Sequence, residues 1–141
     1  MLQLSTKIRY AVRALIEIAK QESDDPVMIS FIAEKQDISV KYLENIMSLL
    51  KTAGIVRSVR GKNGGYLLLG DVDEISVYDV IKAVEGPVSI APCSDSPKLC
   101  RRSSHCVATD LWQEITKYIK GRTKEVSIGE LIKREQRHGS S

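Results

Sequence analysis

Apolar residues recur at three- and four-residue steps in two stretches near the start of the chain. The first stretch, from about Ser5 to Lys20, carries Ile8, Ala11, Val12, Leu15, Ile16 and Ala19. The second begins at Ser39 and stops at Gly54, and it carries Val40, Leu43, Ile46, Met47 and Leu50. This spacing is typical of amphipathic helices, and glycine commonly follows a helix C-terminus. The pattern predicts two helices, with Ser39 capping the second.

A short helix is expected between these two. Ser30 is a plausible N-cap, Ile32 and Ala33 would be buried, and the helix would end near Gln36. Asp37 and Ile38 would then form a tight turn. A short helix, a turn and a longer helix make a helix-turn-helix.

The spacing of apolar residues along the chain changes after Gly54. IVRSVR and YLLL read as two strands, separated by GKNGG, and the pair Asn63-Gly64 favours a type I′ turn. A hairpin over residues 55–69 that directly follows a helix-turn-helix is a wing. The fold class we predict is mainly α with a small β-hairpin: a winged helix-turn-helix DNA-binding domain over residues 1–86, with a long dimerisation helix beyond it.

Three further helices are expected after the wing. Ser76 would cap one that stops at Gly86-Pro87, with Val77, Val80, Ile81 and Val84 buried. Residues 87–106 form a cysteine-rich sensor loop. Residues 107–138 hold a long helix and a last short one, which Ser127 and Glu130 would start as a capping box. The long helix has an apolar stripe made of Ala108, Leu111, Trp112, Ile115 and Ile119. This stripe would be covered by a second subunit, or by packing on the first helix.

Composition and charge narrow the class of protein. The 141 residues are 43% hydrophobic and 28% charged, as in ordinary globular proteins. No apolar run approaches the length of about 18 residues that a membrane span needs. MLQLSTKIRY lacks the apolar stretch of a secretory signal, so we expect a cytoplasmic protein. The net charge of +3 does not by itself indicate a polyanionic partner.

The distribution of polar side chains indicates DNA binding. Opposite its apolar stripe, the helix that starts at Ser39 carries Lys41, Tyr42, Glu44, Asn45, Ser48 and Lys51. Such side chains can read base edges in a major groove, although a solvated helix face has the same composition. The predicted wing adds Arg57, Arg60 and Lys62 beside glycines, a slim cationic tip suited to a minor groove. The two features together favour DNA over plain solvation.

All the cysteines lie in the sensor loop. Cys93, Cys100 and Cys106 are separated by six and five residues of a stretch rich in proline and serine. Thiolates suit an iron–sulfur cluster, whereas zinc sites usually bring ligands in closely spaced pairs, which are absent here. A thiol redox switch, and thiols with no cofactor, remain alternatives. The chain has no H-E-x-x-H, no G-x-S-x-G and no glycine-rich nucleotide loop, so an enzyme is not expected.

Several stretches resemble the IscR/NsrR/CymR family of bacterial winged-helix regulators. They are LSTKIRYAVRALIEIA, ISVKYLENIMSLLKTAGIVRSVRGKNGGYLL, CVATDLW and SIGELI. The resemblance implies a homodimer that binds imperfect palindromic promoter DNA, with Glu44 reading bases and Arg60 as the wing arginine. It is nearest to the three-cysteine branch, which implies a cluster on Cys93, Cys100 and Cys106. Other members respond to cysteine supply without a cluster.

The chain departs from that family at the remaining cluster ligands. The gap between its first two cysteines is one residue longer than usual. Thr109 stands where one branch has a histidine ligand, and Arg9 where another has an aspartate. His105, Asp95 and Asp110 are nearby candidates, and both [2Fe-2S] and [4Fe-4S] clusters remain open. The function predicted is a dimeric regulator whose promoter binding responds to a cluster that senses redox state, nitric oxide or iron–sulfur status. The alternative is a cluster-free regulator with a thiol switch or a response to sulfur or cysteine metabolism.

Overall fold

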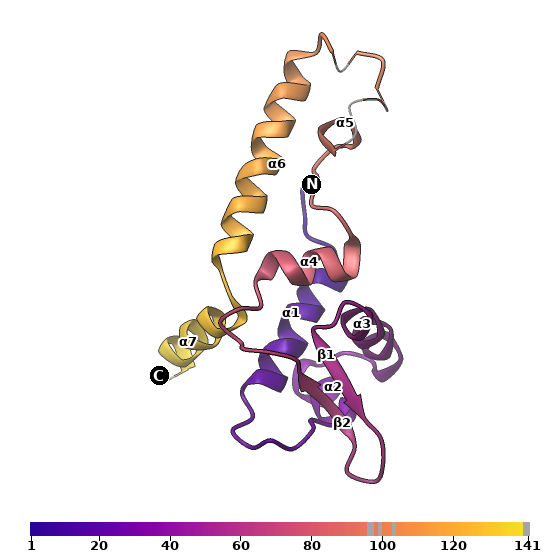
Figure 1. Cartoon of the computed structure of the whole chain (residues 1–141), viewed down its shortest axis with the longest axis vertical. Coiled ribbons are helices and arrows are strands. Elements are labelled where there is room, and N and C mark those ends of the chain that lie inside the picture. Colours follow the sequence, from indigo (N-terminus) through magenta and orange to yellow (C-terminus); the bar gives the residue numbers. More distant parts are fainter. Residues whose placement is uncertain (96–97, 99, 103, 140–141) are drawn as a thin grey trace.

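The chain folds into a group of helices and one β-hairpin, from which a single long helix extends (Figure 1). The computed structural model describes residues 1–95, 98, 100–102 and 104–139. Its elements are α1 (Thr6–Ala19), α2 (Ile29–Gln36), α3 (Val40–Thr52), β1 (Val56–Val59), β2 (Gly65–Leu68), α4 (Val77–Glu85), α5 (Pro92–Asp95), α6 (Val107–Glu125) and α7 (Ile128–Gly139). The predicted order of helices and hairpin is confirmed, except for α5, a short helix inside the segment that was expected to be a loop without helix.

Serine side chains cap the first turn of four helices, α1, α3, α4 and α7. The Ser5 hydroxyl accepts a hydrogen bond from the Ile8 amide, and the Ser39 hydroxyl accepts one from the Tyr42 amide, both over 3.2 Å. Ser76 and Asp79 form a reciprocal capping box at α4. The predicted caps Ser39 and Ser76 are therefore confirmed.

The predicted cap of the short helix is wrong. Met28, not Ser30, is the N-cap of α2, and its side chain makes no capping hydrogen bond. The reason lies in the preceding residue, since Val27 pairs with Tyr66 of β2 through two backbone hydrogen bonds of 2.9 Å. This pairing holds the chain extended up to Met28, so the helix begins directly after it.

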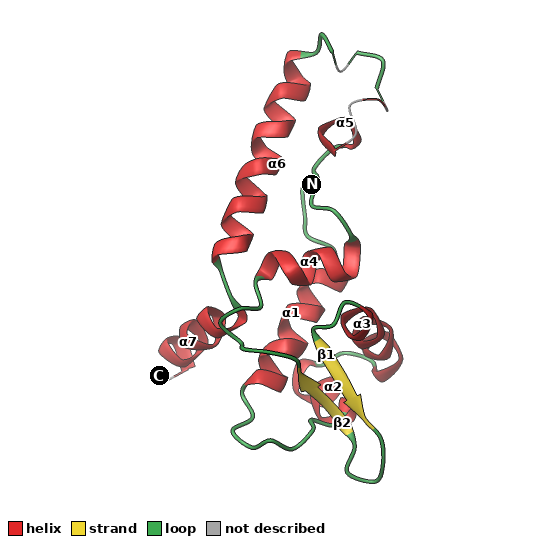
Figure 2. Cartoon of the chain, in the orientation of Figure 1, coloured by secondary structure: helices red, strands yellow, loops and turns green. Residues whose placement is uncertain are grey.

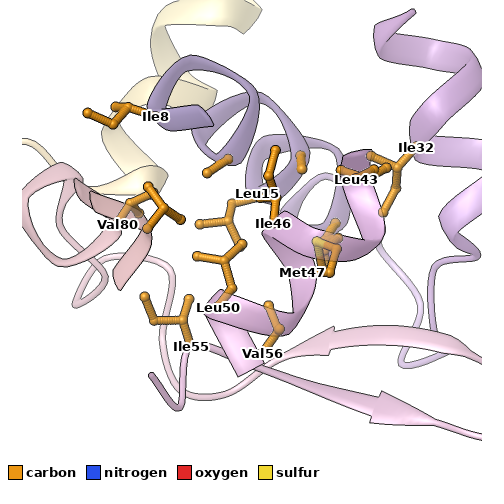
Figure 3. Packing of buried hydrophobic residues seen from close by; sticks show 14 of the residues in the cluster. Ile8, Leu15, Ile32, Leu43, Ile46, Met47, Leu50, Ile55, Val56 and Val80 are labelled. Atoms are coloured by element: carbon orange, nitrogen blue, oxygen red, sulfur yellow. The ribbon is translucent and has the colours of Figure 1, made fainter. Parts of the chain in front are cut away.

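An aliphatic core joins α1, α3 and α4. Figure 3 shows Leu15 of α1 facing Ile46 and Leu50 of α3, with Val80 of α4 beside them, and all four side chains are fully buried. These side chains are closely packed, so replacing one of them with a smaller residue would destabilise the fold.

Burial in three of the helices differs in detail from the prediction. In α1, Ala14 and Ile18 are buried, whereas Val12, Ile16 and Ala19 are only partly buried. The buried side of α1 is wider than one stripe because α3, α4 and α7 all pack against it. At the start of α3, Val40 is 42% exposed because it lies beyond the edge of the core. In α4, Val77 was expected to be buried but is only partly buried, since it is the first residue of the helix, whereas Val80, Ile81 and Val84 are buried as predicted.

The hairpin has a longer tip than a type I′ turn allows. The antiparallel pairing of β1 and β2 ends at Val59 opposite Gly65, which leaves residues 60–64, the hairpin tip, outside the ladder. The Gly64 amide donates to the Gly61 carbonyl over 3.1 Å. Asn63 does not have the positive φ that a type I′ turn requires, so the predicted turn type is wrong. Gly65 has a steric role, because a Cβ there would lie 2.3 Å from the Val27 carbonyl oxygen.

The C-terminal helix returns to the core. The Val77 amide donates to the Val126 carbonyl, and the Ile128 amide donates to the Ile75 carbonyl, both over 2.8 Å. These bonds tie the start of α7 to the start of α4, and they bury Ile128 completely. The Ser127 hydroxyl accepts from the Glu130 amide over 3.0 Å, as predicted, while the Glu130 carboxylate binds Arg134.

The predicted apolar stripe of α6 divides into two parts. Ile115 and Ile119, toward the end of the helix, line a groove with Ile8 of α1 and Ile81 of α4. Toward its start, the helix carries three exposed large apolar residues: Val107, Leu111 and Trp112. Among the described residues, no helix combines the length and the apolar character needed to cross a lipid bilayer.

Candidate nucleic-acid interface and cysteine segment

The exposed side of α3 carries a shallow hollow. It is lined by Ser39, Lys41, Tyr42, Glu44 and Asn45, which we call the α3 hollow. Four of the side chains predicted to contact DNA therefore lie together. They combine an ammonium donor, a carboxylate acceptor and an amide that can both donate and accept, the groups that distinguish base pairs in a major groove.

Tyr42 also has a structural contact. Its ring is half-buried and lies edge-on to the ring of Tyr10 in α1, with the centroids 5.8 Å apart and the planes at 84°. This geometry is favourable for aromatic pairs. The Arg13 guanidinium lies 5.2 Å from the centroid of Tyr10. Tyr42 therefore holds α3 against α1 while it lines the α3 hollow.

The hairpin separates the predicted wing cations into two places. Arg60 and Lys62 are exposed in the hairpin tip, which projects beyond the helices in Figure 2. Arg57 is exposed on β1, where it lines a different hollow with Asp24 and Asp25. Arg57 therefore shares its hollow with two acidic residues, whereas no acidic residue accompanies Arg60 and Lys62 in the hairpin tip.

The cysteine segment, residues 87–106, begins after α4, and its helix α5 lies toward the opposite end of the molecule from the hairpin tip, as does the start of α6 (Figure 1). Cys93 lies in α5, Cys100 has no regular structure and Cys106 is the N-cap of α6. All three are free thiols and half-buried. Residues 96, 97, 99 and 103 of this segment lie outside the described part of the chain.

The first part of the cysteine segment is attached to α6. The Thr116 hydroxyl accepts a hydrogen bond from the Ile90 amide over 3.4 Å and donates one to the Ser94 hydroxyl. Ser94 in turn donates to the Ala91 carbonyl over 2.7 Å. Thr116 is one of two buried residues of α6, and the other is Thr109. A polar contact in the middle of α6 thus anchors the residues on either side of Ala91.

Cys106 has the chemistry of a thiolate ligand. The Thr109 hydroxyl, and then the backbone amides of Thr109 and Ala108, donate toward its sulfur and lower the pKa of the thiol. Amides at the start of a helix stabilise an anion in this way. The candidate ligands His105 and Asp110 are exposed, while the side chain of Asp95 lies outside the described part.

The three thiols fit a soft metal in kind, but they are not gathered. Within the described residues, no three side chains of histidine, cysteine, aspartate or glutamate form a group that could hold a metal ion. A cluster here would require the segment to rearrange around it.

Comparison with known proteins agrees with this architecture. Residues 4–134 match the family model Rrf2, described as "Iron-dependent Transcriptional regulator". The chain belongs to the Rrf2 family. It is therefore a transcriptional regulator, as its relatives are by name. The predicted family and fold class are confirmed.

Regulators named IscR are among the relatives of this chain. The HTH-type transcriptional regulator IscR of Photobacterium profundum is 38% identical over 132 residues, which are 94% of this chain and 76% of that protein. The IscR of Serratia proteamaculans is 37% identical over 131 residues, 93% of this chain and 79% of that protein. Both are regulators by name, and neither name indicates catalysis.

Solved structures that resemble this chain include both a CymR and an IscR. The structure described as CymR (YrzC), the global cysteine regulator of B. subtilis, has a TM-score of 0.77 at 32% identity, covering 95% of this chain and 98% of that one. T. potens IscR has a TM-score of 0.77 at 31% identity, covering 94% and 88%. The fold is thus equally close to an IscR and to a CymR.

Two residues near the interface were not predicted from the sequence. Val40 was assigned to the core, yet it is exposed at the start of α3, beside the α3 hollow. Tyr10 supports Tyr42 from α1. The position of Val40 directly after the N-cap was a usable signal, because the first residue of a helix often lies at its exposed end. The contact of Tyr10 depends on how α1 and α3 pack, which no local pattern shows.

Proposed function

We propose that this Rrf2-family regulator places α3 in the major groove of promoter DNA and the hairpin tip in a flanking minor groove. The α3 hollow supports this most strongly, since Lys41, Glu44 and Asn45 converge there on one exposed helix face. Glu44 would accept from a cytosine amino group, and Asn45 would pair with an adenine. Tyr42 would contribute a contact at the rim of the same hollow.

The hairpin supplies the charge for this arrangement. Arg60 and Lys62 in the exposed tip would contact the phosphates and the minor groove, where the negative potential attracts arginine. Arg57, beside two aspartates, would contribute less. Val40 offers an apolar contact for a thymine methyl group next to the α3 hollow.

A homodimer completes the DNA site. The exposed apolar residues at the start of α6 would be covered by a second copy of the chain, because a monomer leaves Leu111 and Trp112 in water. Two copies related by a twofold axis bind an imperfect palindrome, with their recognition helices about one helical turn of DNA apart.

We further propose that Cys93, Cys100 and Cys106 hold an iron–sulfur cluster. When bound, such a cluster supplies a centre that responds to redox state, nitric oxide or iron–sulfur status. The chain's contribution is to bring three thiolates together between α4 and α6, with the Cys106 thiolate favoured by the amides of the helix start. Gathering the thiols would order the segment, and the contact of Thr116 with Ser94 would transmit that order to α6.

A cluster-free regulator is the second candidate. Two observations favour it: the described residues contain no gathered metal-ligand group, and the fold is as close to the cysteine regulator CymR as to an IscR. In this case the three thiols would act as a redox switch, or the regulator would respond to sulfur or cysteine metabolism.

One experiment separates the two candidates. Protein purified without oxygen is examined by ultraviolet-visible spectroscopy, with iron and sulfide assayed on the same sample. Visible absorption with matching iron and sulfide, lost in Cys100→Ala but kept in the control Ser104→Ala, supports the cluster. A colourless, iron-free protein that also resists reconstitution rules the cluster out and leaves the cluster-free regulator.

A further inference from the structure

The turn of the helix-turn-helix is held by side chains of α1. Gln36 is the last residue of α2, and Asp37, which follows it, has a left-handed backbone with φ of 53°. The Arg13 side chain donates to the Gln36 side-chain oxygen over 2.7 Å and to its backbone carbonyl over 2.5 Å. The Gln36 side-chain amide donates to the Glu17 carboxylate over 2.6 Å. Three hydrogen bonds therefore join one residue of the turn to two residues of α1.

Glu17 is a buried carboxylate whose partners explain its position. It is only 6% exposed, and the other buried residues of α1 are apolar. The Lys20 ammonium lies 3.5 Å from the Glu17 carboxylate and 3.1 Å from that of Glu135 in α7. The hydrogen bond to Glu135, aided by the charge of Glu17, raises the pKa of Lys20. A buried charge of this kind is tolerated only when its hydrogen bonds are made, so the geometry around Glu17 is strongly defined.

Arg13 also connects the contacts of Gln36 and Glu17 to α3, the proposed recognition helix. While its guanidinium binds Gln36, it also lies over Tyr10, and Tyr10 contacts Tyr42 of α3. Arg13 is therefore connected to α3 in two ways. It binds Gln36, just before the turn that leads into α3, and it lies over Tyr10, which contacts the first turn of α3. A shift at Gln36 would move the α3 hollow relative to the rest of the domain.

We propose that Gln36, held by Glu17 and Arg13, is a positioning residue that sets the orientation of α3 for base reading. The inference rests on the proposed insertion of α3 into the major groove. Gln36 is not required to touch DNA. Its effect should fall on sequence preference, because hydrogen bonds to base edges require a defined orientation of α3, whereas phosphate contacts by flexible cations carry no sequence information.

Gln36 donates to Glu17 and accepts from Arg13, so exchanging the amide and the carboxylate between positions 36 and 17 tests the proposal. Gln36→Glu places a second carboxylate against Glu17, where the amide now donates. The double variant Gln36→Glu with Glu17→Gln reverses the donor and the acceptor, so that the amide of residue 17 donates to the carboxylate of residue 36 and Arg13 keeps its acceptor. Gln21→Glu, at an exposed position just after α1, adds the same charge outside the contacts and is the control.

The measurement is the ratio of two dissociation constants for each full-length protein. One probe is a duplex that the unaltered protein selects from a randomised pool, and the other is a scrambled duplex of the same composition. We expect Gln36→Glu to reduce the preference roughly tenfold, the effect of losing about one hydrogen bond to a charged group, and the double variant to restore most of it. Gln21→Glu should leave the ratio unchanged, since added charge weakens binding to both probes.

Other outcomes would overturn the inference. An undiminished preference in Gln36→Glu, or a folded double variant that recovers nothing, shows that these contacts do not position α3. If Gln36→Glu does not fold, Gln36→Met removes both side-chain hydrogen bonds without adding charge, and the same ratio decides. An unaltered protein that selects no sequence would overturn the proposed base reading itself, and this inference with it.

Discussion

The buried hydroxyl of Thr116 on α6 donates a hydrogen bond to the hydroxyl of Ser94, the residue after Cys93, over 3.2 Å. The long helix and the cysteine segment thus share a contact that lies close to the first thiol. The hairpin tip is at the other end of the molecule (Figure 1). Any effect of the thiols on DNA binding must therefore be transmitted through the protein, and α6 is the element that contacts the segment and continues toward α7.

Removing the Thr116 hydroxyl should release the segment. Thr116→Val keeps the shape of the side chain but leaves the Ile90 amide and Ser94 without this partner, at a cost of about 1–2 kcal/mol in the free energy of unfolding. We expect faster amide hydrogen exchange over residues 89–95, measured by mass spectrometry. The control is Thr123→Val, whose hydroxyl binds only backbone carbonyls within α6. Equal exchange in both variants would contradict the anchoring role.

A charge at Trp112 should separate the proposed dimer. Trp112 is 37% exposed on the apolar side of α6, and an aromatic side chain of this size buries about 150–250 Å² in an interface. We expect Trp112→Asp to sediment as a monomer at concentrations where the unaltered protein is a dimer. Gln113→Asp changes an exposed polar neighbour and should stay dimeric. A dimer that survives Trp112→Asp would place the interface elsewhere.

Loss of the Glu44 carboxylate should relax base preference at one position of each half-site. Glu44 lines the α3 hollow, where it can accept from a cytosine. We expect Glu44→Ala to lose about 1–3 kcal/mol of discrimination there, measured by binding to a set of single-base variants of the selected duplex. Glu34→Ala removes an exposed carboxylate from α2 and serves as the control. An unchanged preference would remove Glu44 from the reading surface.

The hairpin cations should differ in how they respond to salt. Because Arg60 lies in the exposed tip, Arg60→Ala should weaken binding to all sequences and reduce the slope of log affinity against log salt by about one. Arg57→Ala removes the same charge beside Asp24 and Asp25, so its effect on the slope should be smaller. Titrations at several salt concentrations compare the two, and equal slopes would contradict this division of the hairpin.

The stability of α7 should depend on the ionisation of Glu130. The hydrogen bond from Arg134, and then the charges of Arg134, Arg137 and Lys133, lower the pKa of this carboxyl. A lowered carboxyl pKa stabilises the fold above the ordinary glutamate value of about 4.3, and that contribution is lost as the pH falls through the lowered pKa. Glu130→Gln should therefore melt below the unaltered protein at pH 7, and the difference should shrink in acid. Glu114→Gln controls for the removal of a surface carboxylate, and a gap that persists in acid would contradict the ionic origin.

Local patterns predicted the elements because their signals act over a few residues. Ser39 and Ser76 cap helices through hydrogen bonds to amides three positions along, and Gly54 follows α3 with the positive φ that glycine adopts easily. The local signal failed where a strand from a distant part of the sequence pairs with the segment before the helix. Ser30 lost its role as a cap because Val27 pairs with Tyr66, almost forty positions away.

The class of the protein could be predicted from local patterns alone: the helical spacing, the hairpin, the polar face of α3 and the position of every cysteine in one segment are all properties of short stretches of sequence. How these parts are used depends on the way the elements pack. The tertiary structure exposed Val40, set Arg57 against Asp24 and Asp25, tied Ser94 to Thr116, and clamped Gln36 between Arg13 and Glu17. The physical reason is that a side chain's burial and partners depend on which elements pack together, and packing joins residues that no period along the chain connects.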